Sequence, residues 1–187
     1  MPGHRRLLSG LALAVGVSAG GVSSPVHASV TGSQGIEIEG ARDRRGLYLG
    51  PGLLFGAQFP AEDGFMPGVA GTFHIGGGVN QRLLLGGNFG LVRYFAPHQS
   101  LGLLGDLEAT GFVWRGFYLR AGLGVAAVPT DDSLSAAMGG NVGGGYELWV
   151  NQTVAMDLGA RYDLRAVPGD PVDARHSVLL GARFTWY

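Results

Sequence analysis

Charged side chains that could do chemistry stand at every second position of several apolar segments. A β-strand turns alternate side chains to the same face, so these groups would share one face while Leu, Val and Phe occupy the other. Together, enclosed groups of this kind form either an ion or proton pathway or a set of paired charges. The set contains Asp106, Glu108, Glu147, Asp157, Asp163, Arg120, Arg161 and Arg183.

A nucleophilic site is the other chemistry that the residue types allow. His176 and Ser177 follow closely on Asp170 and Asp173, and His98 lies near Ser100. A nucleophile, a base and an orienting acid can together carry out acyl transfer. No diagnostic motif surrounds these common loop residues, so catalysis is kept here as an alternative. The histidines at positions 74, 98 and 176 show no metal-ligand spacing, and we expect neither a metal nor a cofactor.

Eight predicted strands of 9 to 13 residues position the charged side chains. They are longer than the ~5–6 residues usual in soluble sheets and close to the ~9–11 that cross a bilayer at a tilt. Their connectors alternate between tight turns, at 80–81, 115–116 and 150–153, and longer loops, at 60–66, 96–100, 129–137 and 166–175. The predicted strands are 47–59, 69–79, 83–95, 101–113, 117–127, 138–148, 154–164 and 178–186.

The N-terminal segment predicts export. Arg5 and Arg6 precede an apolar run from Leu7 to Val17, which is too short to span a bilayer. Val26-His27-Ala28 places small residues at the sites that a signal peptidase reads, which predicts cleavage after Ala28. We therefore expect a cleaved signal peptide at 1–28, a periplasmic linker at 29–45 and a barrel at 46–187.

Composition narrows the function classes. The net charge is −1, without the basic excess typical of nucleic-acid binding, and charged residues make up only 14% of the 187 residues. Cysteine is absent, which leaves no disulfide framework and no thiol nucleophile. No stretch beyond the signal contains 18 continuous apolar residues, which argues against helical membrane spans.

Two all-β architectures fit the alternation. A soluble β-sandwich would bury its apolar face and carry more surface charge, whereas a membrane barrel turns that face to lipid and must close to pair its backbone groups. The low charge, the secretory signal and the loop asymmetry favour an eight-stranded antiparallel up-and-down transmembrane β-barrel. Eight strands leave a lumen that side chains can fill, so we expect a plugged interior, with a narrow pore as the alternative. Arg183 is expected to matter most, as the inward charge on the closing strand.

The last strand carries a specific resemblance. Gly181, Phe184 and Trp186 have the glycine–aromatic–aromatic spacing of the C-terminal assembly signal of bacterial outer-membrane proteins. Leu179 and the additional Tyr187 depart from that pattern. The barrel as a whole resembles the small outer-membrane barrels of the OmpA and OmpX type.

This resemblance implies a place in the outer membrane of a Gram-negative bacterium. It implies assembly by the barrel assembly machinery, contact with outer-membrane lipid and lipopolysaccharide, and a monomer with a structural or surface-interaction role. The alternative within the class is a lipid-modifying hydrolase or acyltransferase with Ser, His and Asp at the rim.

Two further expectations concern local structure. Trp114 and Trp149 adjoin tight turns and Trp186 ends the last strand, so all three are predicted to form an aromatic girdle at the periplasmic rim. Pro51 removes a backbone donor inside the first strand, where we expect a bulge or kink.

Overall fold

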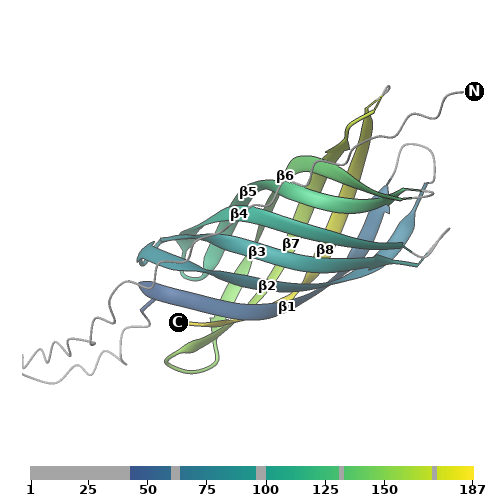
Figure 1. Cartoon of the computed structure of the whole chain (residues 1–187). Coiled ribbons are helices and arrows are strands. Elements are labelled where there is room, and N and C mark those ends of the chain that lie inside the picture. Colours follow the sequence, from purple (N-terminus) through teal and green to yellow (C-terminus); the bar gives the residue numbers. More distant parts are fainter. Residues whose placement is uncertain (1–42, 60–63, 96–99, 131–132, 170–171) are drawn as a thin grey trace, which may run out of the picture. The chain divides into compact units, whose positions relative to one another are not determined.

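The protein forms a closed antiparallel barrel of eight strands (Figure 1). The computed structural model describes residues 43–59, 64–95, 100–130, 133–169 and 172–187. The strands are β1 (Gly46–Phe59), β2 (Met66–Asn80), β3 (Leu83–Tyr94), β4 (Ser100–Trp114), β5 (Phe117–Thr130), β6 (Ser133–Trp149), β7 (Val154–Val167) and β8 (Asp173–Trp186). The predicted fold class is confirmed, while the predicted signal peptide and nearly all of the linker lie outside the described residues.

Strand β8 closes the barrel by pairing with β1. Leu49 lies opposite Trp186, Gly52 opposite Arg183 and Phe59 opposite His176. On its other side β8 pairs with β7, and the Tyr187 N–H extends that contact by donating to the carbonyl of Thr153, just before β7, at 2.8 Å. The described part of the chain contains no helix long and apolar enough to span a membrane.

Alternate side chains of each strand face out and in. The outer surface is apolar, with Leu107 at 76% and Leu123 at 75% exposure. The inner row includes Asn88 at 0% and Asp106 at 3%. This arrangement is the reverse of a soluble sandwich, which would bury the leucines and expose the carboxylates.

Tight turns join the strands at one end of the barrel, which we call the turn end. Asn80 Oδ1 accepts from the backbone N–H groups of Arg82 and Leu83, at 2.7 and 3.0 Å. Asn151 does the same for Thr153 and Val154, at 2.9 and 2.8 Å. The shared Val-Asn-Gln sequence of the two turns thus has a physical basis, since asparagine caps both of them.

The third tight turn uses positive φ angles at both central residues. Arg115 has φ 46° and Gly116 has φ 125°, which matches the right-handed twist of the flanking strands.

Two inward tyrosines lie over glycines of neighbouring strands. A Cβ atom on Gly76 would come within 2.6 Å of the Tyr48 hydroxyl oxygen, and Gly86 is as close. Glycine therefore makes room for an aromatic ring inside the narrow lumen. The same arrangement recurs on the other side of the barrel, with Tyr118 over Gly145 and Gly159.

The strands extend further toward the opposite end, the loop end, than the sequence predicts. The strands are 12 to 17 residues long. Strand β5 continues to Thr130, β6 begins at Ser133 and β8 begins at Asp173. Most of the predicted loop 129–137 is therefore strand, and strand residues make up half of the predicted loop 166–175. The apolar alternation marks only the part of a strand that faces lipid, whereas backbone pairing continues beyond it.

Pro51 produces no bulge. Its pairing with Phe73 is in register, and the β1–β8 ladder resumes unshifted at Gly52 after omitting Gly50 and Pro51. Pro51, which has no backbone N–H, thus lies at a position where β1 and β8 make no pair. Register shifts occur elsewhere, between Gly78 and Asn80 and between Phe112 and Trp114.

Closure can be tested at Gly181, where a Cβ atom would lie 2.7 Å from the Leu54 Cα of β1. We expect Gly181→Leu to prevent stable closure, because the new side chain overlaps the partner strand. Gly111→Leu is the matched control, since a Cβ there meets nothing within 4 Å. The measurement is the difference in gel migration between unboiled and boiled protein in SDS. A normal difference for Gly181→Leu would contradict this account of the β1–β8 contact.

Candidate functional site: the charged lumen

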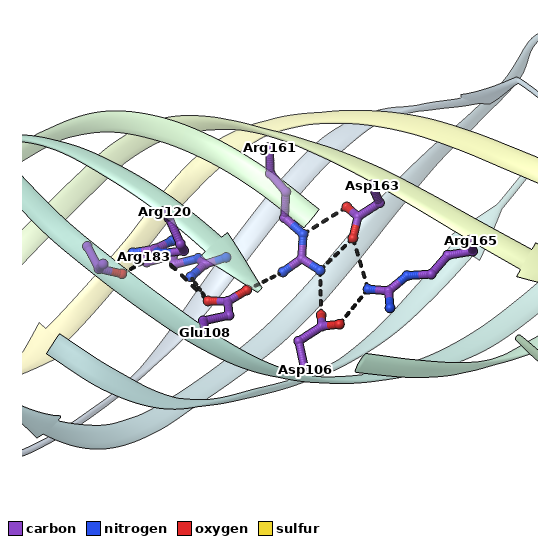
Figure 2. A network of polar contacts seen from close by, with 8 residues as sticks. Asp106, Glu108, Arg120, Arg161, Asp163, Arg165 and Arg183 are labelled. Atoms are coloured by element: carbon purple, nitrogen blue, oxygen red, sulfur yellow. Dashed lines mark hydrogen bonds and ion pairs between the residues drawn. The ribbon is translucent and has the colours of Figure 1, made fainter. Parts of the chain in front are cut away.

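Arg161 of β7 is the centre of the charged interior (Figure 2). Its Nε and Nη2 atoms donate to Asp163 at 2.8 and 2.6 Å. Its Nη1 donates to Glu108 at 2.7 Å, and Nη2 also reaches Asp106 at 2.5 Å. Because Asp106 and Glu108 lie on β4, these bonds join strands that are not neighbours and cross the lumen.

The network continues toward the loop end through Arg165. Its Nη2 donates to Asp106 at 2.5 Å and to Asp163 at 3.1 Å. Sequence reasoning missed this arginine because it ended the strand at Leu164. The signal was present, since positions 161, 163 and 165 continue the same alternation.

Toward the turn end, Glu108 Oε2 faces two further arginines. Arg183 lies 3.4 Å from it and Arg120 lies 3.6 Å from it. Arg120 also donates to Thr110 at 2.9 Å. Arg161 contacts three carboxylates at shorter distances while Arg183 contacts one, so the geometry favours Arg161 over Arg183 as the centre of the network.

A second chain of buried groups links three strands. The Thr185 hydroxyl donates to Asp157 at 3.2 Å and lies 2.9 Å from His74 Nε2. Since the hydroxyl hydrogen is directed to Asp157, the imidazole Nε2–H donates to Thr185. All three residues are at most 5% exposed, so this chain stabilises the interior and is not open to a substrate.

Glu147 holds the turn end of the lumen closed. Arg44 Nη2 and Nε lie 2.6 and 2.7 Å from its Oε1, and the Tyr187 hydroxyl donates to its Oε2 at 2.6 Å. Trp149 stacks on Tyr187 with a centroid distance of 5.0 Å. Burial and the neighbouring Glu147 charge raise the pKa of Tyr187, so the phenol keeps its hydrogen. We call Arg44, Glu147, Trp149 and Tyr187 the turn-end cap.

The residues before β1 are attached to the turn between β2 and β3. Asp43 accepts from the Gln81 side chain at 2.6 Å, and Arg44 donates to the Gln81 carbonyl at 3.1 Å. Side-chain hydrogen bonds from Arg45 lower the pKa of Asp43 to about 2. The end of the predicted linker is therefore part of the barrel structure.

Charge inside the described part of the barrel is balanced. Five carboxylates (Asp106, Glu108, Glu147, Asp157 and Asp163) and five arginines (Arg44, Arg120, Arg161, Arg165 and Arg183) all have an ion-pair or hydrogen-bond partner. At the loop end, Arg175 pairs with Asp173. The two cavities beside these residues measure about 40 and 10 Å³. Because one water needs roughly 10–15 Å³, the larger cavity has room for only a few waters. Among the residues that the structure describes, no cluster of His, Asp and Glu could hold a metal ion.

The structure does not bring the candidate nucleophile and base together. Ser177 is buried in the lumen, whereas His176 is on the lipid-facing row, with Nδ1 2.5 Å from the Tyr162 hydroxyl. Asp173 pairs with Arg175 at 2.7 Å. Because β8 includes all of them, successive residues point to opposite faces. Asp170 and His98 lie outside the described residues, as does the side chain of Ser100.

The three tryptophans lie at the turn end but not on one surface. Trp114 and Trp186 are 61% and 44% exposed, and Trp114 stacks on the outward ring of Phe117, which in turn contacts Tyr146. Trp149 instead turns inward onto Tyr187, because position 149 belongs to the inner row of β6. In the terminal motif, Phe184 and Trp186 face outward and Gly181 faces Leu54 of β1.

A closed sheet with an apolar exterior, a charged interior, and tight turns at one end defines the class of small outer-membrane β-barrels. No protein-family model and no curated protein matches the sequence.

A solved structure with a TM-score above 0.5 shows the same fold. The chain is similar to Neisserial surface protein A, with 18% identity and a TM-score of 0.53 over 75% of this chain and 96% of that one. Ail of Yersinia pestis shows 14% identity and a TM-score of 0.45, covering 76% and 99% of the two chains. OprG from Pseudomonas aeruginosa shows 11% and 0.46, covering 78% and 99%.

Arg161→Met should reduce the free energy of unfolding by about 3–5 kcal/mol, because it leaves Asp106, Glu108 and Asp163 short of a shared buried partner. Urea unfolding in lipid vesicles measures this loss. Arg82→Met, at an exposed turn position, is the control and should change stability by no more than ~0.5 kcal/mol. Equal stability of the two variants would show that Arg161 does not organise the interior.

Proposed function

We propose that the protein is a closed, non-conducting outer-membrane barrel with a structural or surface-contact role. The observation that carries this proposal is the ion-pair network of Arg161, which joins β7 to β4 across the lumen. An ion on its way through the barrel would have to displace this network and then the turn-end cap. Both barriers consist of buried pairs whose separation leaves charges unpaired at a cost of several kcal/mol.

Recordings from planar bilayers test whether the barrel conducts. We expect the refolded full chain to give no stable channels, because side chains occupy the space that ions would need. Arg161→Met is the informative variant, and brief leak currents in it alone would support the plug. Reproducible open channels in the unaltered protein would refute the proposal and favour the narrow pore.

The outer surface supports a contact with the outer leaflet. Arg93 and His176 are the basic residues on the lipid-facing rows of the described strands, and both lie toward the loop end. A charge there escapes the hydrocarbon and reaches the headgroups. We infer that Arg93 contacts phosphate groups of lipopolysaccharide.

Replacing Arg93 tests this contact. Lipopolysaccharide vesicles should raise the melting temperature of the barrel, and Arg93→Gln should lose part of that increase because the cation is gone. Arg82→Gln, at the turn end, should keep the full increase. Vesicles of phosphatidylcholine give the reference temperature for each protein. An equal increase for Arg93→Gln and the unaltered protein would exclude a role for Arg93.

A further inference from the structure

An open groove of about 400 Å³ lies at the turn end of the barrel, beside the β2–β3 and β4–β5 turns. This volume is within the range of roughly 300–1,000 Å³ that is usual for ligand sites. The described residues that line it include three arginines, Arg44, Arg82 and Arg115, and no carboxylate. Arg44 is neutralised by Glu147 in the turn-end cap. The other two arginines are exposed and have no ion-pair partner among the residues that the structure describes, so the groove is positively charged.

A β-bulge turns two successive side chains of β4 outward at this groove. The register of β4 and β5 shifts between Phe112 and Trp114, and Val113 and Trp114 are both exposed. Strict alternation would turn Trp114 inward, because Val113 already occupies an outer position, and a bulge can redirect a side chain in this way. The Trp114 ring stacks on Phe117 of β5 with a centroid distance of 5.8 Å. The lipid-facing surface of the barrel therefore continues into the groove.

Arg115 has an unusual backbone conformation at the same place. In the described part of the chain it is the only residue other than glycine with a positive φ angle, at 46°. The first position of such a turn favours Asn, Asp or Gly. The Arg115 guanidinium carbon lies 5.2 Å from the centroid of the Trp114 ring. An arginine in this unfavourable conformation indicates that its side chain has a role beyond forming the turn.

The position of the groove in the membrane favours a lipid ligand over a water-soluble one. Short turns of outer-membrane barrels face the periplasm, and exposed aromatic rings such as Trp114 mark the level of the headgroups. The groove is therefore level with the headgroups of the periplasmic leaflet. Val113 and Trp114 offer an apolar surface to acyl chains, and the Arg115 guanidinium offers several N–H donors to a phosphate. Basic pockets at other membrane surfaces bind anionic headgroups in this way.

We propose that this groove binds an anionic glycerophospholipid of the periplasmic leaflet, represented by phosphatidylglycerol. The phosphodiester accepts hydrogen bonds from Arg115, and the acyl chains extend along Val113 and Trp114. Arg82 adds positive charge, but in the described part of the chain its guanidinium contacts no outward ring, so the phosphate contact is assigned to Arg115. A zwitterionic headgroup brings its own cation to a groove that has no carboxylate for it, and therefore binds more weakly. This inference goes beyond the proposed function, which concerns the closed lumen and the outer leaflet.

Fluorine NMR tests the site in the refolded full chain, labelled with 5-fluorotryptophan and placed in phosphatidylcholine nanodiscs. Phosphatidylglycerol replaces phosphatidylcholine in steps. The Trp114 resonance reports on the groove, and the Trp186 resonance, from an exposed ring that does not line it, reports the general effect of the added lipid. We expect a saturable shift at Trp114 with phosphatidylglycerol, a much smaller one with phosphatidylethanolamine, and none with inorganic phosphate, which has no acyl chains.

Arg115→Gln and Arg82→Gln are a matched pair, because each removes one positive charge from the groove. Arg115→Gln should raise the fraction of phosphatidylglycerol that gives half of the Trp114 shift about fivefold, and Arg82→Gln less than about twofold, since an exposed charge without a specific contact contributes little. The gel-migration difference confirms that each variant is folded.

Equal effects of the two substitutions would show that net charge alone attracts the lipid, and would overturn the assigned contact. Absence of a saturable Trp114 shift, or an equal shift at Trp186, would overturn the groove as a site. Equal shifts with phosphatidylethanolamine would overturn the preference for an anionic lipid, and a saturable shift with inorganic phosphate would indicate an oxyanion site instead. The bilayer recordings and the Arg93→Gln measurement remain separate tests of the proposed function.

Discussion

The pairing of β8 with β1 is the constraint on which the rest of the structure depends. Within hydrocarbon an unpaired backbone N–H or C=O costs several kcal/mol, so the sheet can exist there only if its two edges meet. Closure with eight strands makes the lumen narrow. It also decides that the polar row of every strand shares one small interior, so that charges from β4, β5, β7 and β8 must neutralise one another.

The interior network shows how this requirement is met. Arg161 can serve three carboxylates because a planar guanidinium carries five N–H donors, which a lysine ammonium could not arrange in the same way. Glycine has the complementary role, since Gly76 and Gly86 let the Tyr48 ring enter the same interior. Arginine and carboxylate side chains thus fill the lumen, and glycines leave the room that the tyrosine rings need.

The alternation of residues predicted strands with two unlike faces, and the low charge, the secretory signal and the loop asymmetry decided for a membrane barrel over a soluble sandwich. Once the barrel is chosen, the two-residue period also gives the inward direction of the charges, because the polar row of a closed membrane sheet must face the lumen. Strand ends were not predictable from the alternation, since pairing continues beyond the lipid, and Arg165 was missed for that reason. Trp149 was predicted to join the aromatic girdle because it adjoins a tight turn. Adjacency to a turn does not determine whether a residue belongs to the inner or the outer row of its strand, and Trp149 belongs to the inner row. Arg44 and Glu147 meet through the closed three-dimensional arrangement, and no spacing in the sequence indicates their contact.

The turn-end cap has a consequence for the timing of assembly. Glu147 is bound by Arg44, which precedes the first strand, and by Tyr187, the last residue of the chain. Its charge is fully compensated only when both ends of the sheet have arrived. A barrel stalled before β8 is in place would keep the Arg44 ion pair but leave Glu147 Oε2 without the Tyr187 hydroxyl, so the second hydrogen bond to this carboxylate forms only in the closed barrel.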